Sequence, residues 1–252
     1  MRVVFPQAKE LKNLVSATVA FLTEGTFKAT EEGIHLASLD PSKVGVVILD
    51  LYQNAFLDYE VDGEEIFTIN LEDLKKILGK AKTREQVEWE LDKENNRFII
   101  SIHGKATKKF VLPLIEGEGE IMDISSLSSS LDLPIQIEMD AKAFKEIIDS
   151  AKVVSDEVKL VADPEGPTFS IVAEGELKEM RIDLTPQDET ILFMEIPQKA
   201  MSTYSIDYLD KLTKVATISD TVSIRFNSNN PVWFDYKLAD RFKYSFILAP
   251  RE

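Results

Sequence analysis

One short helical pattern occurs four times in this chain of 252 residues. Each copy has an apolar residue, two polar residues of which at least one is lysine, and then a second apolar residue. The copies begin at Leu11, Leu74, Phe144 and Leu209. Apolar residues at positions i, i+3 and usually i+4 form one stripe of an α-helix. The pattern therefore predicts four amphipathic helices in an internally repeated protein.

Alternating strands follow every predicted helix. Pairs of period-two strands joined by turn residues predict hairpins at residues 26–39, 87–102, 158–172 and 222–236. A further strand is expected at residues 44–51, 107–114, 179–184 and 244–248. The predicted fold class is α+β, with two similar domains, each made of two strand-helix-three-strand units. Its helices would cover one face of antiparallel sheets.

The segment at residues 115–133 differs in composition from the rest. It begins acidic and glycine-rich and continues into a serine-rich run. We interpret it as a linker between an N-terminal domain of residues 1–114 and a C-terminal domain of residues 134–252. Apolar residues within it, Ile124 and Leu127 among them, could lie along an apolar surface.

Overall composition narrows the class of protein. The net charge of −15 describes an acidic surface and argues against a generic nucleic-acid binder, which is usually basic. The absence of cysteine excludes disulfides, thiolate metal sites and cysteine nucleophiles. We expect no membrane span and no signal peptide, because no apolar run reaches about 18 residues and the N-terminus lacks an apolar core segment.

Basic residues recur on the polar faces of the predicted helices. Placed on a helical wheel, they lie opposite the apolar stripe, although Glu146 and Asp149 share that face on the third helix. The set is Lys9, Lys12, Lys76, Lys80, Lys142, Lys145, Lys211 and Lys214. Two interpretations remain open from the residues alone: ordinary solvated helix faces, or a lysine strip suited to phosphate contacts without base reading.

The sequence contains no motif typical of a catalytic site. It has no phosphate-binding glycine loop, no zinc-protease motif and no nucleophile elbow. We interpret His35 and His103 as structural or surface residues, and we predict no catalytic residues, metal or cofactor. A nuclease with carboxylate-bound metal is the alternative class, and it predicts metal-dependent activity.

Three segments carry a family resemblance: residues 36–44, 235–240 and 246–251, the last ending in Leu248-Ala249-Pro250-Arg251. Together they resemble the sliding-clamp family of proliferating cell nuclear antigen in its archaeal form, and the resemblance covers the whole chain. It implies a DNA polymerase processivity clamp: a ring of three subunits around duplex DNA, with helices lining the hole and sheets outside. The lysines above would then face DNA, most directly Lys12, Lys76, Lys80 and Lys214.

The resemblance also implies a pocket for short peptides of partner enzymes. DNA polymerase, the clamp loader, flap endonuclease and DNA ligase would insert apolar anchors there, and the backbone of residues 249–251 would pair with the peptide. The implied pocket residues are Leu39, Val44, Val46, Ile124, Leu127, Pro231, Ile247, Ala249 and Pro250.

Finally, the resemblance implies that subunits join through edge strands at residues 105–113 and 177–184. The implied interface residues are Lys108, Lys109, Phe110, Leu112, Glu179, Met180, Ile182 and Leu184, with Glu176 adding charge complementarity. Whether the ring is a homotrimer or a heterotrimer is left open, as is a ring-shaped scaffold that does not hold DNA. The expected location is the cytoplasm with the archaeal nucleoid, or the nucleus in a eukaryote.

Overall fold

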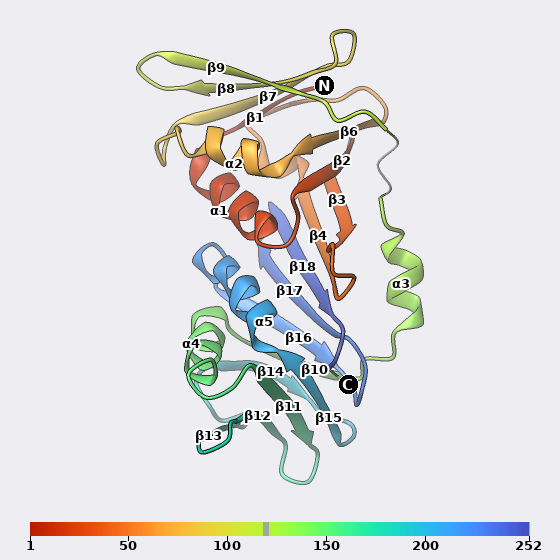
Figure 1. Cartoon of the computed structure of the whole chain (residues 1–252), viewed down its shortest axis with the longest axis vertical. Helices are drawn as coiled ribbons and strands as arrows, with labels where there is room; N and C mark the ends of the chain where they lie inside the picture. Colours follow the sequence, from red (N-terminus) through yellow and green to blue (C-terminus); the bar gives the residue numbers. More distant parts are fainter. Residues whose placement is uncertain (118–120, 252) are drawn as a thin grey trace. The chain divides into compact units, whose positions relative to one another are not determined.

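The structure is a computed structural model that describes residues 1–117 and 121–251. It contains two compact units, each considered by itself (Figure 1). Unit 1 comprises residues 1–41, 47–117, 121–122 and 238–244, and unit 2 comprises residues 42–46, 123–237 and 245–251. Residues 118–120, which belong to the predicted linker, lie outside the described residues.

In unit 1 the strand-helix-three-strand order occurs twice, as predicted. The elements are β1 (Arg2–Phe5), α1 (Ala8–Val19), β2 (Glu24–Thr30), β3 (Gly33–Leu39), β4 (Gly45–Tyr52), the 3₁₀-helix η1 (Gln53–Ala55), β5 (Asp58–Glu60), β6 (Glu65–Asn70), α2 (Leu71–Leu78), β7 (Gln86–Asp92), β8 (Arg97–His103) and β9 (Thr107–Pro113). The short strand β5 is an addition to the predicted order.

The same order is repeated in unit 2, again with one added strand, β14. The elements are α3 (Ile124–Ser130), β10 (Ile135–Asp140), α4 (Ala141–Ala151), β11 (Glu157–Asp163), β12 (Thr168–Glu174), β13 (Glu179–Leu184), β14 (Ile191–Glu195), β15 (Ala200–Ser205), α5 (Ile206–Leu212), the 3₁₀-helix η2 (Thr213–Thr217), β16 (Thr221–Phe226), β17 (Val232–Leu238) and β18 (Phe242–Leu248).

Antiparallel pairing organises the strands of each unit. One sheet of unit 1 has the order β5-β1-β7-β8-β9, and β2 pairs with both β3 and β6. One sheet of unit 2 has the order β13-β12-β11-β15, and β10 pairs with both β14 and β16. The strands β9 and β13 therefore occupy corresponding edges in the two units.

The core of each unit lies between sheet and helices. Trp89 of β7 is fully buried, and its ring contacts Phe5, Phe27 and Phe98 at centroid separations of 4.8, 6.0 and 5.4 Å. In unit 2, Phe144 of α4 contacts Phe234 of β17 at 5.7 Å. Full burial of each such side chain stabilises the fold by about 1.5–3 kcal/mol.

The four repeated helical phrases fall in α1, α2, α4 and α5, and their apolar stripes are buried. Side-chain caps start two of these helices: Asn70 accepts from the Asp73 N–H at 2.9 Å, and Asp140 accepts from the Ala143 N–H at 2.7 Å. None of the helices in the described ranges is long and apolar enough to span a membrane.

Two local features were not predicted from the sequence. The serine-rich part of the linker forms the helix α3, because Asp123 caps it by accepting from the Ser125 and Ser126 N–H groups. The Ser126 hydroxyl also donates to Asp123 at 2.5 Å, and this bond, followed by those from the N–H groups, holds the pKa of Asp123 below its usual range. In addition, α5 ends at Leu212, so Lys214 lies on a 3₁₀ turn instead of the predicted α-helix.

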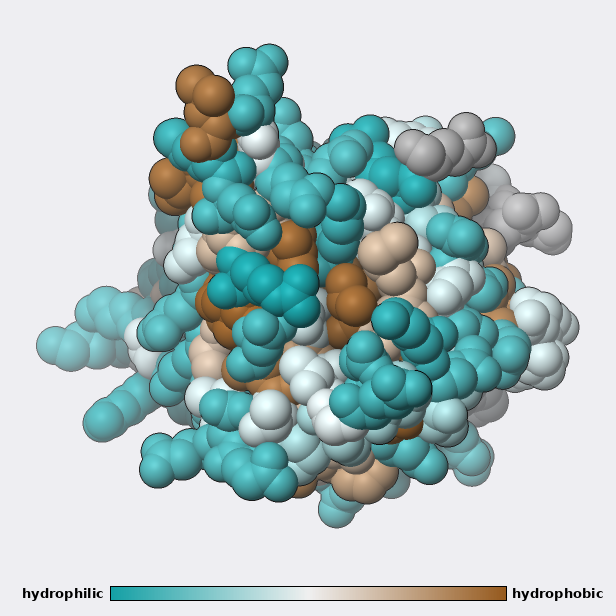
Figure 2. Space-filling view, turned by 90° about the horizontal axis from the view of Figure 1, so that it is seen from below, coloured by the Kyte–Doolittle hydropathy of each residue, from teal (hydrophilic) through white to brown (hydrophobic). Residues whose placement is uncertain are grey.

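The face of the molecule seen in Figure 2 is mostly hydrophilic, with apolar patches separated by hydrophilic side chains. The most exposed large apolar side chains are Leu177, at 97% exposure, and Val153, at 70%. Scattered exposure of this kind is normal for a folded protein.

Candidate nucleic-acid interface, peptide groove and strand edges

The helices pair within each unit. In unit 1, α1 and α2 lie side by side, and Lys12 Nζ donates to the Ala81 carbonyl at 2.9 Å (Figure 1). In unit 2, Lys152 after α4 forms an ion pair with Asp210 of α5, with 2.6 Å between Nζ and Oδ2. This pairing gathers the predicted lysines into one set per unit.

The lysines of unit 1 are largely exposed to solvent. Lys9, Lys76 and Lys80 are all exposed. The Lys76 side chain retains 72% exposure although its Nζ lies 3.0 Å from Asp73 Oδ1. Three further exposed basic residues of α2 and the segment after it were missed in the sequence: Lys75, Lys82 and Arg84. Lys82 and Arg84 follow the end of α2 at Leu78, so the wheel drawn for this helix did not include them.

In unit 2 acidic partners lie on the same helices as the lysines. Lys145 Nζ lies 2.6 Å from Asp149 Oδ2, and Lys211 Nζ lies 2.7 Å from Asp207 Oδ2. Lys142 and Lys214 are exposed. Each i, i+4 pair lowers the local positive charge that a phosphate would meet, so this helix pair is the weaker candidate for DNA contact.

Most residues of the predicted peptide pocket lie in unit 2. Ile247 and Val46 are buried, with 4% and 6% exposure, whereas Val44, Pro231, Ala249 and Pro250 are half-buried. The Ala249 N–H donates to the Val44 carbonyl at 2.9 Å, which sets the end of β18 beside the start of β4. Ile124 and Leu127 are half-buried on α3, and Leu39 lies in unit 1 with 38% exposure.

The C-terminal tail already uses its backbone donors. Besides the bond from Ala249, the Arg251 N–H donates to the Thr203 carbonyl at 2.8 Å, and Pro250 has no N–H. A peptide strand could therefore pair with this tail only by donating to its carbonyl groups. The backbone pairing that the resemblance implies for residues 249–251 is therefore limited to hydrogen bonds that the tail accepts.

A buried polar cluster on β16, β17 and β18 was not recognised in the sequence. Asp235 is 8% exposed and accepts hydrogen bonds from Trp233 Nε1 at 2.9 Å and Ser245 Oγ at 2.5 Å. Its second oxygen accepts from Arg225 Nη2 at 3.1 Å, and the Arg225 guanidinium lies 4.8 Å from the Trp233 ring centre. The only sign of this cluster in the sequence is that Trp233 and Asp235 are two residues apart on a predicted strand and therefore lie on the same face.

The predicted edge strands are edges in the structure. β9 ends the five-stranded sheet of unit 1 and β13 ends the four-stranded sheet of unit 2. They begin at Thr107 and Glu179, as the strand pattern predicts, two residues after the starts at 105 and 177 that the resemblance implies. Burial alternates along each: Phe110 and Leu112, and Met180, Ile182 and Leu184, face inward more than their neighbours.

The charged residues of β9 are basic, whereas β13 carries Glu179 together with an ion pair between Arg181 and Asp183 at 2.9 Å. Lys109 of β9 is exposed, while Lys108 donates from Nζ to the Lys80 carbonyl at 3.0 Å within its own chain. Glu179 of β13 and Glu176 before it are exposed. Charge complementarity between the two edges therefore depends on Lys109 more than on Lys108.

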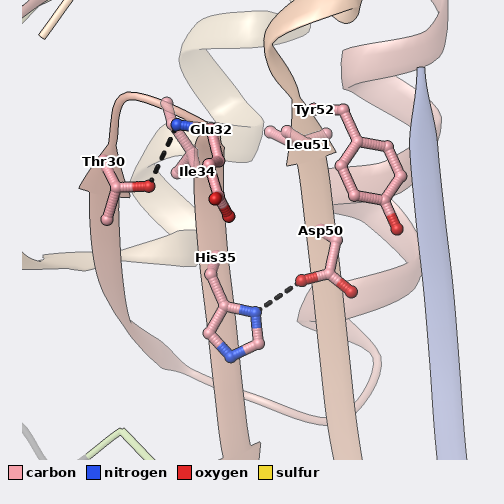
Figure 3. Close-up of a pocket in the computed structure, with 8 residues that line it drawn as sticks. Thr30, Glu32, Ile34, His35, Asp50, Leu51 and Tyr52 are labelled. Atoms are coloured by element: carbon pink, nitrogen blue, oxygen red, sulfur yellow. Dashed lines mark hydrogen bonds and ion pairs between the residues drawn. The ribbon is translucent and has the colours of Figure 1, made fainter. Parts of the chain in front are cut away.

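Both histidines contact carboxylates. His35 Nδ1 lies 2.6 Å from Asp50 Oδ1 beside a shallow groove lined by Thr30, Glu32 and Tyr52 (Figure 3). Across residues 1–117 and 121–251, no three histidine, aspartate or glutamate side chains gather in a way that could hold a metal ion.

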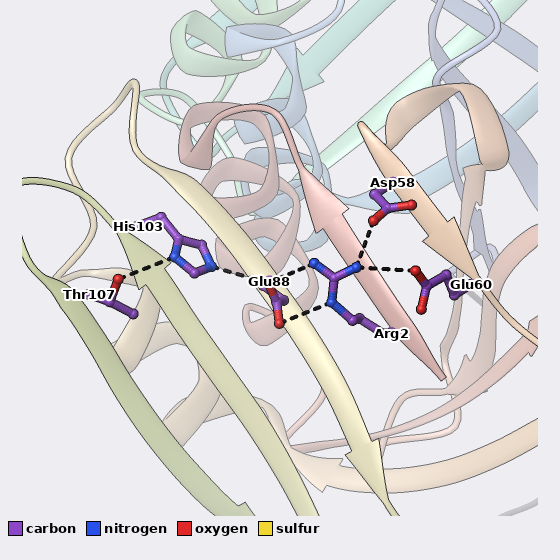
Figure 4. A network of polar contacts seen from close by, with 6 residues as sticks. All are labelled: Arg2, Asp58, Glu60, Glu88, His103 and Thr107. Carbon is purple, nitrogen blue, oxygen red and sulfur yellow. Dashed lines mark hydrogen bonds and ion pairs between the residues drawn. The ribbon is translucent and has the colours of Figure 1, made fainter.

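His103 belongs to a network that ties the first strand to its neighbours (Figure 4). Arg2 donates to Asp58 at 2.6 Å and to Glu88 at 3.2 Å, and His103 Nε2 lies 3.2 Å from Glu88 Oε2. Partial burial alone would raise the pKa of Glu88, but the hydrogen bonds from Arg2 and His103 together outweigh it and hold that pKa below its ordinary value.

These features define a duplicated α+β protein. Each unit has one lysine-bearing helix pair and one edge strand, and the exposed residues Lys109 on β9 and Glu179 on β13 have opposite charges. Models of the N-terminal and C-terminal domains of proliferating cell nuclear antigen match residues 1–118 and 123–251 respectively. The chain therefore belongs to the proliferating cell nuclear antigen family, which confirms the family and fold class predicted from the sequence.

Archaeal proteins are among its relatives. The chain is 41% identical over 252 residues to a DNA polymerase sliding clamp of Nanoarchaeum equitans, covering 100% of this chain and 99% of the relative. It is 36% identical over 250 residues to the corresponding clamp of Pyrococcus abyssi, covering 99% and 97%.

Two solved structures of this family have the same fold as this chain. A structure of proliferating cell nuclear antigen from Thermococcus kodakaraensis superposes with a TM-score of 0.90 at 31% identity, covering 99% of each chain. A chain of the PCNA2–PCNA3 complex from Sulfolobus tokodaii superposes with a TM-score of 0.89 at 26% identity, covering 100% of this chain and 99% of that one.

Proposed function

We propose that this chain is a DNA sliding clamp whose copies close into a ring of three around duplex DNA and hold DNA polymerase on its template. The observation that carries ring closure is the pair of edge strands, β9 and β13, one in each unit. Pairing β9 of one copy with β13 of the next is a heterologous contact, which forms a closed ring when the rotation between copies is suitable.

The strand edges support this contact chemically. Pairing would satisfy the backbone groups along both edges and bury Phe110 and Leu112 against Met180 and Ile182. Lys109 and Glu179 would add attraction of opposite charges at the rim. Ring closure also removes two edges that would otherwise invite unspecific strand pairing.

DNA binding in this proposal is independent of base sequence. Lys9, Lys12, Lys76 and Lys80 of unit 1 offer a phosphate-binding surface, with Lys142, Lys145, Lys211 and Lys214 of unit 2 as weaker contacts. Weak contacts suffice because a closed ring is held on DNA by topology, so the chain can carry a net charge of −15.

Partner enzymes would bind at the predicted pocket residues of unit 2. We propose that short peptides of DNA polymerase, the clamp loader, flap endonuclease and DNA ligase place apolar anchors against Val46 and Ile247, with Ile124 and Leu127 as further contacts. The role of Leu39 stays a prediction from the family resemblance. The chain itself has no catalytic role in this proposal and acts in the cytoplasm on the chromosome. The division into residues 1–114, 115–133 and 134–252 stays a prediction.

A heterotrimer is the second candidate, because one structural relative is a chain of the PCNA2–PCNA3 complex. Light scattering after gel filtration separates the two possibilities. We expect a species of about three times the monomer mass of 28.4 kDa for a homotrimer. A stable monomer at micromolar concentration would contradict it and favour a ring of distinct subunits.

The clamp function itself is tested with a polymerase on primed circular DNA. Adding this chain together with a clamp loader should lengthen the products made in a single binding event. Linear DNA with open ends serves as the control, because a topologically held ring slides off it. Equal retention on circular and linear DNA would contradict encirclement.

A further inference from the structure

Unit 2 has a strand edge that the proposed ring closure leaves free. The strand β14 is the last of its sheet, and among residues 1–117 and 121–251 only β10 pairs with it. Ring closure would use β13, which lies in the other sheet of this unit. Unpaired backbone groups along such an edge are a template for pairing with another chain unless charges or a covering segment protect them.

The centre of β14 is apolar and exposed to solvent. Leu192 is 57% exposed and Phe193 is 44% exposed. The register of β14 shifts next to Glu138 of β10 and leaves Leu192 without an opposite residue, as in a β-bulge. Met194 lies opposite the buried Ile137, so Phe193 faces the other side of the sheet, with Glu138 directly opposite. Two large apolar side chains therefore stand in water beside a free strand edge.

The equivalent strand of unit 1 is protected by charges. β5 pairs with β1 as β14 pairs with β10. Two of the three residues of β5 are acids, Asp58 and Glu60, and Arg2 Nη1 lies 2.6 Å from the first carboxylate and 3.4 Å from the second. The exposed apolar edge occurs in β14 and not in β5, so it does not follow from the repeated fold alone.

Acidic residues surround the exposed Phe193. Glu138 is its half-buried neighbour across the strand pair, and the exposed Glu195 follows two residues later on the same face of the sheet. Arg225 of β16 lies further along this face, but it forms an ion pair with Asp235 at 3.1 Å. These acids therefore give the apolar edge a negative local charge.

Together these features specify what could bind there. A free edge accepts an extended chain, which forms main-chain hydrogen bonds with it, and the exposed side chains of Leu192 and Phe193 favour apolar residues in that chain. The acids favour basic residues at its ends. A second copy of β14 fits poorly, because antiparallel pairing would bring the exposed Glu195 of one copy toward the exposed Glu189 of the other.

We propose that the free edge of β14 is a docking site for an extended segment of another protein, in which apolar residues stand between lysines or arginines. The segment adds a strand beside β14, packs its apolar side chains on Leu192 and Phe193, and places its basic ends near Glu189 and Glu195. This site uses none of the predicted pocket residues of unit 2, and it does not depend on the proposed clamp function.

Fluorescence anisotropy of a labelled synthetic peptide tests the site. The probe has about six residues, with valine and threonine alternating between a lysine at each end. Leu192→Thr combined with Phe193→Thr should weaken its binding about tenfold, because the apolar contact is lost without a change of charge. Ile66→Thr is the matched control, since Ile66 on β6 is also 44% exposed, and it should leave the Kd unchanged. Glu189→Gln combined with Glu195→Gln should weaken binding about threefold and reduce its dependence on salt.

Modified peptides separate strand addition from simple attraction. N-methyl groups on the amides of one edge of the peptide should abolish binding, while N-methyl groups on the other edge should be tolerated. The proposal is wrong if the probe does not bind at millimolar concentration, if both methylated peptides bind equally, or if a peptide with glutamate ends binds as tightly. A molecular mass that doubles in light scattering and returns to its single value in the Leu192→Thr, Phe193→Thr variant would identify a second copy as the occupant and also overturn it. Circular dichroism confirms that each variant is folded.

Discussion

The two units repeat the same order of strands and helices but differ in how their charges are neutralised. In unit 1, Lys9 and Lys80 are exposed and Lys76 keeps most of its surface despite its contact with Asp73. In unit 2, Lys145 and Lys211 pair with Asp149 and Asp207 one helical turn away. A repeated fold therefore does not imply a repeated electrostatic surface.

The edge strands show a second difference of the same kind. Lys109 is exposed on β9 of unit 1, and Glu179 is exposed on β13 of unit 2. Two edges of the same charge would repel one another, whereas opposite charges favour pairing between different halves of neighbouring copies. The contrast between units is thus what a head-to-tail ring needs, and the following variants test it.

The largest expected effect is loss of the ring. Phe110→Asp in β9 and Ile182→Asp in β13 should each convert the trimer to monomers, because an unpaired carboxylate buried in the contact costs several kcal/mol. Light scattering measures the mass. Ile66→Asp, at an exposed position of β6, is the control and should leave the trimer intact. A trimer that survives both edge variants would place the contact elsewhere.

The next effect concerns DNA. Lys76→Glu combined with Lys80→Glu in unit 1 should reduce polymerase stimulation on primed circular DNA by about tenfold at low salt, since two phosphate contacts become repulsive. The matched pair Lys145→Glu and Lys211→Glu in unit 2 should reduce it only about two- to threefold, because those lysines are already neutralised. Equal losses from both pairs would show that the two helix pairs contribute alike.

A smaller effect of opposite sign follows from the acids of unit 2. Asp149→Asn combined with Asp207→Asn releases Lys145 and Lys211 and should make this helix pair resemble that of unit 1. We expect DNA affinity to rise about two- to threefold, with a steeper dependence on salt concentration. Fluorescence anisotropy of a labelled duplex measures both, and unchanged affinity would mean that these lysines do not reach phosphate.

The smallest effect concerns the first strand of unit 1. Glu88→Gln weakens the hydrogen bonds to Arg2 and His103 and should destabilise the protein by about 1–2 kcal/mol at pH 7. Folding lowers the pKa of Glu88, so its contribution is present above its unfolded value, near 4.5, and is lost as the pH falls through the folded value. The Tm difference between wild type and variant should therefore narrow in acid.

The control variant in unit 2 is Glu138→Gln on β10, where the glutamate is half-buried like Glu88. It should change Tm less than Glu88→Gln at pH 7. Thermal unfolding followed by circular dichroism at pH 7 and at pH 4 measures all three proteins. A Tm difference for Glu88→Gln that stays constant between these pH values would contradict the linkage.

Much of the local structure was predictable from side-chain periodicity. The apolar stripes beginning at Leu11, Leu74, Phe144 and Leu209 specify helices because helix formation and burial of one face follow from residues three and four apart. The helix α3 escaped prediction because serine is a poor helix former in a helix interior, and its start depends on a single cap, Asp123.

The candidate sites were predictable only in part. The edge strands and most lysines came from pattern and family resemblance. The cluster of Trp233, Asp235 and Arg225 was missed, because it depends on the register of β16 against β17, which the alternation within either strand does not reveal. Likewise, nothing near Lys108 in the sequence indicates that its side chain turns back to the Lys80 carbonyl.

By itself the sequence determined the repeated order of strands and helices, the family, and the types of residue available on each helix face. The tertiary structure decided which lysines are neutralised by acids, where the Lys108 side chain lies, and which side chains surround Asp235. The physical reason is the distance along the sequence. Periodicity relates residues within one or two helical turns, whereas ion pairs, strand register and burial join distant residues that only folding brings together.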